Sequence, residues 1–228
     1  MADGTVYVSG FPQVVALDAT TLSLEWPWED PDDDSPVSTP VDQAVQWRHG
    51  PPEGTLPDRR AWYSPALSDE LAFVPFWGEA STPELRAIDR RDGGERWVRR
   101  IGERTPPEWT DWRLTPPVVT DDAVLVGADD GTVYCFGHDG DAQWGTPVGG
   151  VPQFLLAGGP RAVVGVETPE RSSALLALDL DSGDVRWRLG YGKGLAGAAL
   201  AVQRLYVVAC TERRDDGDVA ETTLVALS

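Results

Sequence analysis

The stretch ALDLDSGDVRW, residues 177–187, contains an alternating strand, a turn of Asp, Ser and Gly, and a second strand that ends on tryptophan. This pattern is typical of a β-hairpin, because alternation places every second side chain on one face and glycine allows the positive φ of a tight turn. The pattern recurs as AIDRRDGGERW at 87–97, ALDATTLSLEW at 16–26 and, in a shorter form, CFGHDGDAQW at 135–144. A partial copy, LVALS, occupies 224–228. Recurrence at intervals of tens of residues indicates a repeat protein.

Further short apolar segments precede each hairpin, so a full unit holds four strands, named a, b, c and d here. No amphipathic helix of ten or more residues is evident. Four short antiparallel strands per repeat predict an all-β fold, a β-propeller with one blade per unit. The chain forms one domain, 1–228, of three full and two partial units, with eighteen strands. The predicted units are about 1–28, 63–100, 115–146, 151–190 and 195–228, with an inserted loop at 27–62.

The ring that these units form is expected to be incomplete. The first unit lacks its inner strand a and the last lacks its outer strand d, and an open ring exposes sheet edges and apolar blade faces. The sequence therefore favours a fragment, a split gene product or half of an assembly.

The repeated motif, Ala-x-Asp-x-x-Thr/Ser-Gly-x-x-x-Trp after strands of the GTVYV type at 4–8 and 131–135, carries a family resemblance. It resembles the pyrroloquinoline quinone (PQQ)-like repeat, which occurs in quinoprotein alcohol dehydrogenases and outer-membrane assembly lipoproteins. The resemblance covers nearly the whole chain except 27–62, and it is specific for fold rather than for function. Members of this family are often exported, which would place the protein outside the cytoplasm. The family usually forms seven or eight blades.

Within each repeat, certain positions are predicted to be structural. The aspartate should accept hydrogen bonds from backbone amides of the turn, and the glycine should supply the positive φ. The tryptophan of strand d should pack between neighbouring blades while its indole donates to a backbone carbonyl. These residues are Asp18, Trp26, Asp89, Gly93, Trp97, Gly140, Trp144, Asp179, Gly183 and Trp187.

The long connections are predicted to share one face of the propeller. In an antiparallel blade the a–b and c–d turns lie on one face, and the b–c and d–a connections lie on the other. The second set contains the long excursions, which include 27–62 and 101–114, and long loops on a rigid scaffold commonly bind ligands. Partner or ligand contact is therefore predicted at Trp47, Trp62, Trp77, Trp109, Trp112 and Arg113. The alternative for Trp47 and Trp62 is that they pin the insert onto the ring.

Enzymatic chemistry is not favoured by the sequence. The resemblance to quinoproteins implies PQQ, calcium and a catalytic aspartate, but the chain has neither the adjacent cysteines nor the asparagine of that family, so no catalytic residue or metal ligand is assigned. The leading hypothesis is a noncatalytic scaffold that needs no cofactor and binds a protein or small ligand. The alternative is part of a PQQ- and calcium-dependent dehydrogenase whose catalytic blades lie outside this chain. A third hypothesis is that an oligomer or second chain completes the ring.

The composition excludes some partners and indicates a saline habitat. A net charge of −18 argues against nucleic acid, which requires a basic face. Lys193 is the only lysine among 19 basic residues, against 37 acidic ones, a composition typical of halophiles; a GC-rich genome also replaces Lys with Arg. No apolar run approaches the roughly 20 residues of a membrane span, and no signal peptide is visible. Cys135 and Cys210 are interpreted as buried free thiols, with a disulfide left open.

Overall fold

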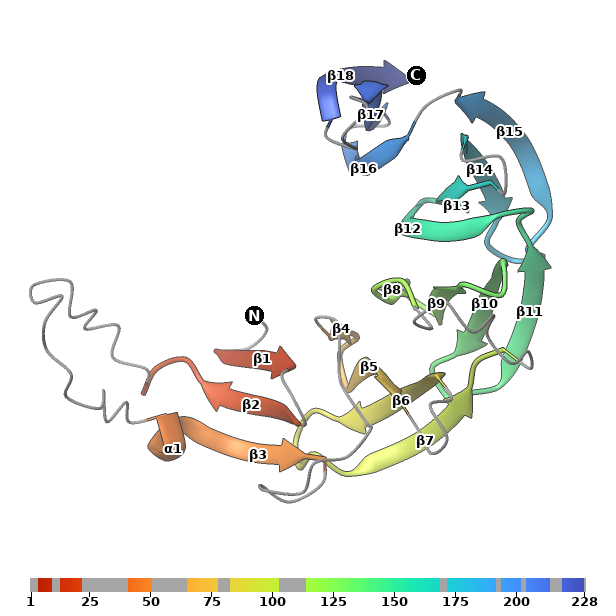
Figure 1. Ribbon diagram of the computed structural model, residues 1–228. Helices are drawn as coiled ribbons and strands as arrows, with labels where there is room; N and C mark the ends of the chain where they lie inside the picture. The colour runs from red at the N-terminus through yellow and green to blue at the C-terminus, as the bar shows by residue number, and fades with distance from the viewer. Residues whose placement is uncertain are drawn as a thin grey trace, which may run out of the picture.

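The computed structural model describes residues 4–9, 13–21, 41–50, 65–77, 83–102, 114–168, 172–191, 194–201, 204–213 and 219–227. These residues form eighteen β-strands and one four-residue helix, α1 (Val41–Ala44). The strands make five antiparallel sheets, each of which we call a blade, and the blades follow one another along an open arc (Figure 1).

Within every blade, strands that are consecutive in the chain are neighbours in the sheet. Blade 1 contains β1 (Thr5–Ser9), β2 (Val14–Asp18) and β3 (Val45–His49). Blade 2 contains β4 (Ala66–Leu67), β5 (Leu71–Trp77), β6 (Pro83–Asp89) and β7 (Glu95–Arg100). Blade 3 contains β8 (Val118–Val119), β9 (Ala123–Ala128), β10 (Thr132–Gly137) and β11 (Ala142–Pro147). Blade 4 contains β12 (Val151–Gly158), β13 (Arg161–Glu167), β14 (Ser173–Asp179) and β15 (Val185–Tyr191). Blade 5 contains β16 (Leu195–Ala201), β17 (Arg204–Arg213) and β18 (Val219–Leu227).

This architecture confirms the predicted all-β, propeller-like fold with three four-stranded and two three-stranded units. Blade 1 supplies strands b, c and d, and blade 5 supplies strands a, b and c. Figure 1 shows strands a along the inner side of the arc and strands d along its outer side, with blades 1 and 5 at its two ends.

Strands c and d share one register in blades 1 to 4. A tryptophan of strand d lies opposite a small residue of strand c, and the register shifts by one residue immediately before that tryptophan, as a β-bulge does. The pairs are Ala16 with Trp47, Ala87 with Trp97, Cys135 with Trp144, and Ala177 with Trp187. A slip of one residue would turn every side chain to the other face, so the shared register fixes which residues enter the junctions.

Blade 1 corrects one sequence prediction. Its strand d is β3, which carries Trp47, and not the segment ending at Trp26. Two residues after Trp47 still pair with β2, whereas Pro27 follows Trp26 and has no N–H to give to a ladder. The stretch 27–62, predicted as an inserted loop, therefore contains α1 and β3.

The same finding moves one long connection to the other face of the arc. Residues 19–44 join strands c and d, so this connection leaves blade 1 at the end where the short c–d turns of the other blades lie. The prediction that every long connection shares one face is wrong for this segment.

The core lies between blades as a series of apolar layers. Val14, Trp47 and Val74 belong to the layer between blades 1 and 2. Equivalent clusters join blades 2 and 3, blades 3 and 4, and blades 4 and 5. Cys135 lies in the third of these layers as a free, fully buried thiol, and burial raises its pKa to about 12.

Candidate functional site

The c–d turns are held by an aspartate at the end of strand c. Asp18 accepts a hydrogen bond from the backbone N–H of Thr20 at 2.8 Å, and Asp89 accepts one from that of Arg91 at 2.8 Å. Asp179 accepts the backbone N–H of Asp181 at 3.1 Å. Such side-chain bonds replace backbone bonds that a turn cannot make.

Two of these aspartates also pair with an arginine that the sequence analysis did not single out. Arg96 donates to Asp89, and Arg186 donates to Asp179 at 2.8 Å. These hydrogen bonds lower the pKa of both carboxyl groups, because they stabilise the ionised form. An arginine seven residues after the aspartate in both hairpins was the signal available in the sequence.

In blades 1 to 3 the tryptophan of strand d docks onto the c–d turn of the following blade. Each indole Nε1–H donates to a backbone carbonyl in that turn, and each ring adds to the apolar layer below it. The bonds are Trp47 to Arg90 at 2.9 Å, Trp97 to His138 at 2.8 Å, and Trp144 to Leu180 at 2.8 Å.

A glycine in each receiving turn faces the docked indole. Gly93, Gly140 and Gly183 have φ of 73°, 86° and 74°, a region that L side chains avoid. A Cβ at these positions would lie 2.7 to 2.8 Å from indole carbons of the preceding blade, well inside contact distance. Glycine is therefore required both by the backbone conformation and by the close approach of the ring.

A third contact completes each dock, and the sequence analysis missed it. The residue two positions after the tryptophan bonds to the carbonyl of the turn glycine. The pairs are His49 Nδ1 to Gly93 at 3.1 Å, Arg99 Nε to Gly140 at 2.7 Å, and Thr146 Oγ1 to Gly183 at 2.8 Å. No sequence signal marks this position, because histidine, arginine and threonine share only the ability to donate.

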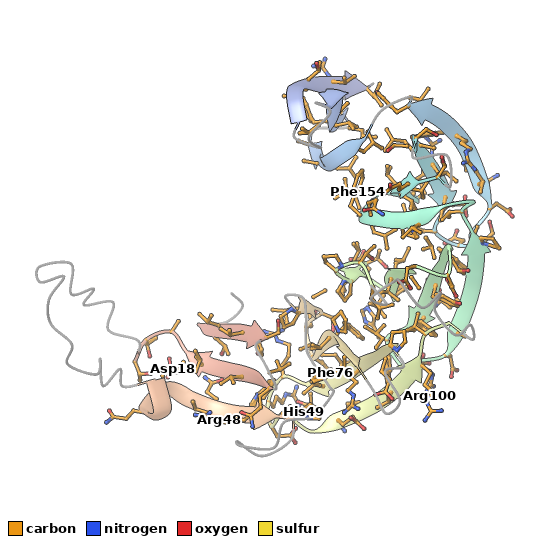
Figure 2. The ribbon with its side chains drawn as sticks, in the orientation of Figure 1. Asp18, Arg48, His49, Phe76, Arg100 and Phe154 are labelled. Carbon is orange, nitrogen blue, oxygen red and sulfur yellow. The ribbon has the colours of Figure 1, made fainter. Side chains whose placement is uncertain are left out.

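The donor between blades 1 and 2 is His49, an ionisable side chain that lies close to a carboxylate. His49 lies at the end of β3, beside Phe76 of β5, with ring centroids 6.0 Å apart (Figure 2). Burial lowers the pKa of His49, so the neutral ring donates through Nδ1 to Gly93. Its Nε2 lies 3.7 Å from the Glu95 carboxylate, which accepts a hydrogen bond from Arg86 at 3.0 Å. This group links blade 1 to blade 2.

The residues predicted to contact a partner have different fates. The prediction that Trp47 contacts a partner is wrong. This side chain is 7 % exposed and docked on blade 2, so it does not present a contact surface. Trp77 ends β5, but its side chain lies outside the described part of the structure. Four further residues, together with the structural candidate Trp26, lie wholly outside it, namely Trp62, Trp109, Trp112 and Arg113.

The described part of the chain holds neither a cluster of metal-ligating side chains nor a helix that could span a membrane. Its histidines, cysteine and carboxylates form no group of three that could hold a metal ion. Its single helix is far too short to cross a bilayer.

Comparisons with solved structures agree with this geometry. BamB from Moraxella catarrhalis superposes with a TM-score of 0.63 at 17 % identity, over 100 % of this chain and 55 % of that chain. A europium-containing methanol dehydrogenase gives 0.62 at 16 % identity, over 92 % and 46 %. The computationally designed Ika8 protein gives 0.55 at 13 % identity, over 100 % and 57 %. At these identities the likeness concerns the fold, and the chain spans about half the length of the structures it matches.

The comparison with protein families is more specific. A search among curated proteins found no match. Residues 39–221, from α1 to β18, match a PQQ-like family described as outer membrane protein assembly factor BamB. This range includes all four Trp-bearing strands d and the three docks between them. The chain therefore belongs to that PQQ-like, BamB-type propeller family.

Proposed function

We propose that this protein is a noncatalytic propeller scaffold that binds a protein partner during an assembly process. The observation that carries the proposal is the match of residues 39–221 to an outer membrane protein assembly factor. The docks support it, because three bonded and sterically matched junctions hold blades 1 to 4 as a rigid platform for loops. The family description also supports a location outside the cytoplasm, and the acidic surface supports work in concentrated salt.

The contact surface that we propose is the face of the b–c and d–a connections on blades 2 and 3. Trp62 lies in the connection from β3 to β4, Trp77 lies at the exit of β5, and Trp109, Trp112 and Arg113 lie in the connection from β7 to β8. All three connections leave the sheets at the same end, because strands alternate in direction. Tryptophan and arginine are the residue types that most often dominate binding energy at protein interfaces.

A loop variant tests this surface. The full chain, tagged and isolated from its source cells at native salt, should retain one partner in stoichiometric amount. The triple substitution Trp109→Ala, Trp112→Ala and Arg113→Ala should release that partner, whereas Asp181→Ala, in a c–d turn on the other face, should retain it. Equal retention by both variants, or no stoichiometric partner at all, would refute the proposed contact.

A second function is favoured by the likeness to a europium-containing methanol dehydrogenase. In this alternative the chain is part of a PQQ-dependent dehydrogenase whose catalytic residues come from other blades. Titration with PQQ in the presence of Ca²⁺ or Eu³⁺ separates the two functions. Saturable, metal-dependent quenching of tryptophan fluorescence would support the dehydrogenase, and an unchanged signal would support the scaffold.

A further inference from the structure

The dock between blades 1 and 2 is built on a residue whose charge changes near neutral pH. In all three docks the side chain two positions after the strand-d tryptophan bonds to the turn glycine, and along the arc it is His49, Arg99 and Thr146. Arginine stays protonated and threonine does not titrate in ordinary buffers, whereas histidine changes its charge at an ordinary pKa of about 6.5. Of these three described docks, the one made by His49 can therefore respond to a modest change of pH.

The contacts of its two ring nitrogens show that His49 is neutral in this dock. A carbonyl oxygen can only accept, so Nδ1 carries the proton in the 3.1 Å bond to Gly93. In a neutral ring Nε2 is then a bare acceptor. This atom is buried, makes no hydrogen bond to a described residue, and lies 3.7 Å from the Glu95 carboxylate. A proton on Nε2 would thus be a buried donor with no acceptor at hydrogen-bond distance among the described residues.

Two charged side chains on other strands face this ring. Glu95 begins β7, and Arg86 lies on β6. Arg86 donates to Glu95 at 3.0 Å and to Glu84 at 2.7 Å. Its guanidinium also lies 4.9 Å from the centroid of the Phe76 ring. These contacts hold a positive charge close to the imidazole, with both carboxylates already paired to it. A second positive charge, on His49, would have to compete with Arg86 for Glu95.

The remaining neighbours of the ring present no charge to it. Phe76 of β5 meets the imidazole edge-on (Figure 2), and the c–d turn of blade 2 contributes the Gly93 carbonyl. Arg48 precedes the histidine on β3, so its side chain points to the opposite face of the strand. Burial of the imidazole is the strongest influence and lowers its pKa; the Gly93 carbonyl and Glu95 raise the pKa, and Arg86 lowers it. The balance favours a neutral ring in the closed junction.

We propose that the junction between blades 1 and 2 is a pH-sensitive joint that opens when His49 takes up a proton. The closed junction buries a neutral ring, whereas an open junction lets water solvate the protonated ring. The open form therefore binds the proton at a higher pH than the closed form does. The closed form should lose stability as pH falls below about 6.5, until the pKa of the closed form is reached. Each pH unit between the two pKa values raises the ratio of open to closed form about tenfold. This inference is independent of the proposed scaffold function.

The indole N–H groups of the docked tryptophans report the opening of each junction separately. The Nε1–H of Trp47 is bonded across the junction between blades 1 and 2, and that of Trp144 across the junction between blades 3 and 4. Hydrogen exchange of both groups is followed by NMR on the full chain at molar salt, from about pH 7.5 to about pH 5. The ratio of the Trp47 rate to the Trp144 rate cancels the direct effect of pH on exchange chemistry. This ratio should rise as pH falls, and the His49 ring signals should titrate below about 6.5.

Substitutions of the two histidines test whether the His49 imidazole is the cause. His49→Arg and His49→Thr install the donors that the other two docks use, so the ratio should no longer depend on pH. His138→Gln is the matched control. It removes the other histidine of the chain but keeps the backbone carbonyl that Trp97 uses, so the wild-type pH dependence should remain. This variant also leaves one set of histidine signals, which assigns those of His49.

The wild-type ratio and the histidine titration require no substitution, so they test the joint even where a variant fails to fold. A ratio that stays constant in the wild-type chain, or a His49 pKa above about 6.5, would overturn the proposal. So would a pH dependence that survives both substitutions of His49 or disappears in His138→Gln.

Discussion

The substitution Gly140→Ala probes the dock between blades 2 and 3. Gly140 has φ of 86°, which costs an L residue about 1 to 2 kcal/mol. Its Cβ would lie 2.8 Å from two carbons of the Trp97 indole. The ring cannot retreat freely, because it donates to His138 at 2.8 Å and Arg99 donates to Gly140 at 2.7 Å. Crowding of this kind costs about 1 to 3 kcal/mol more.

Gly159→Ala is the matched control for this substitution. Gly159 has φ of 58° in an exposed turn, and a Cβ there would meet no atom within 4 Å. It should bear the conformational cost alone. The two variants should therefore differ by about 2 kcal/mol in the free energy of unfolding, or by about 4 to 8 °C in Tm for a chain of this size. Urea and thermal denaturation followed by circular dichroism measure the difference. Equal destabilisation by the two substitutions would refute the steric argument for the dock.

Three further predictions concern single side chains. Trp144→Phe replaces the indole by a smaller phenyl ring and leaves the Leu180 carbonyl without its donor, so it should cost about 1 to 3 kcal/mol in urea denaturation. Trp187→Phe makes the same change in ring size where the indole bonds to no described residue, so it should cost less. The hydrogen bond from Arg96 lowers the pKa of Asp89 below 3.8 in the folded chain, so between that lowered pKa and 3.8 the unfolded chain binds more protons than the folded chain. The free energy of unfolding should therefore fall as pH drops through this range, and Asp89→Asn should flatten the dependence. In a Cys210→Ser chain, Cys135 should react with a thiol reagent only on unfolding, and prompt labelling of the native chain would contradict its burial.

Much of the fold could be predicted from the sequence because one hairpin is repeated. Alternation, the turn glycine and the aspartate are local signals, because each reflects interactions between residues at most about ten positions apart in the chain. Their recurrence was enough to predict eighteen strands, which the structure confirms. The strand order within blades followed from the same argument, since short turns join only antiparallel neighbours.

The assignment of strand d in blade 1 failed for a physical reason. Both LSLEW and VQWRH present a tryptophan behind a polar residue, so the local pattern does not choose between them. The choice depends on contacts across the junction, where Trp47 bonds to Arg90 and His49 bonds to Gly93, more than 40 residues away in the chain. A contact between blades leaves a trace in a single sequence only where the same residue type recurs. The donor two positions after the tryptophan is histidine, arginine or threonine, so it went unnoticed.

The docks run in one direction along the arc, and this direction explains what is exposed at its end. In blades 1 to 3 the tryptophan of strand d donates a hydrogen bond to the c–d turn of the next blade. The corresponding acceptor for Trp187 of blade 4 would be a c–d turn after β18. Among the described residues nothing occupies that position, and Leu189, two residues after Trp187, is 41 % exposed where the other blades place a bonded donor. The junction between blades 4 and 5 thus keeps its apolar layer but lacks the polar lock. A strand d that paired with β18 would cover the outer edge of β18 and hold the c–d turn of blade 5 in place. It should therefore stabilise blade 4 as well as blade 5.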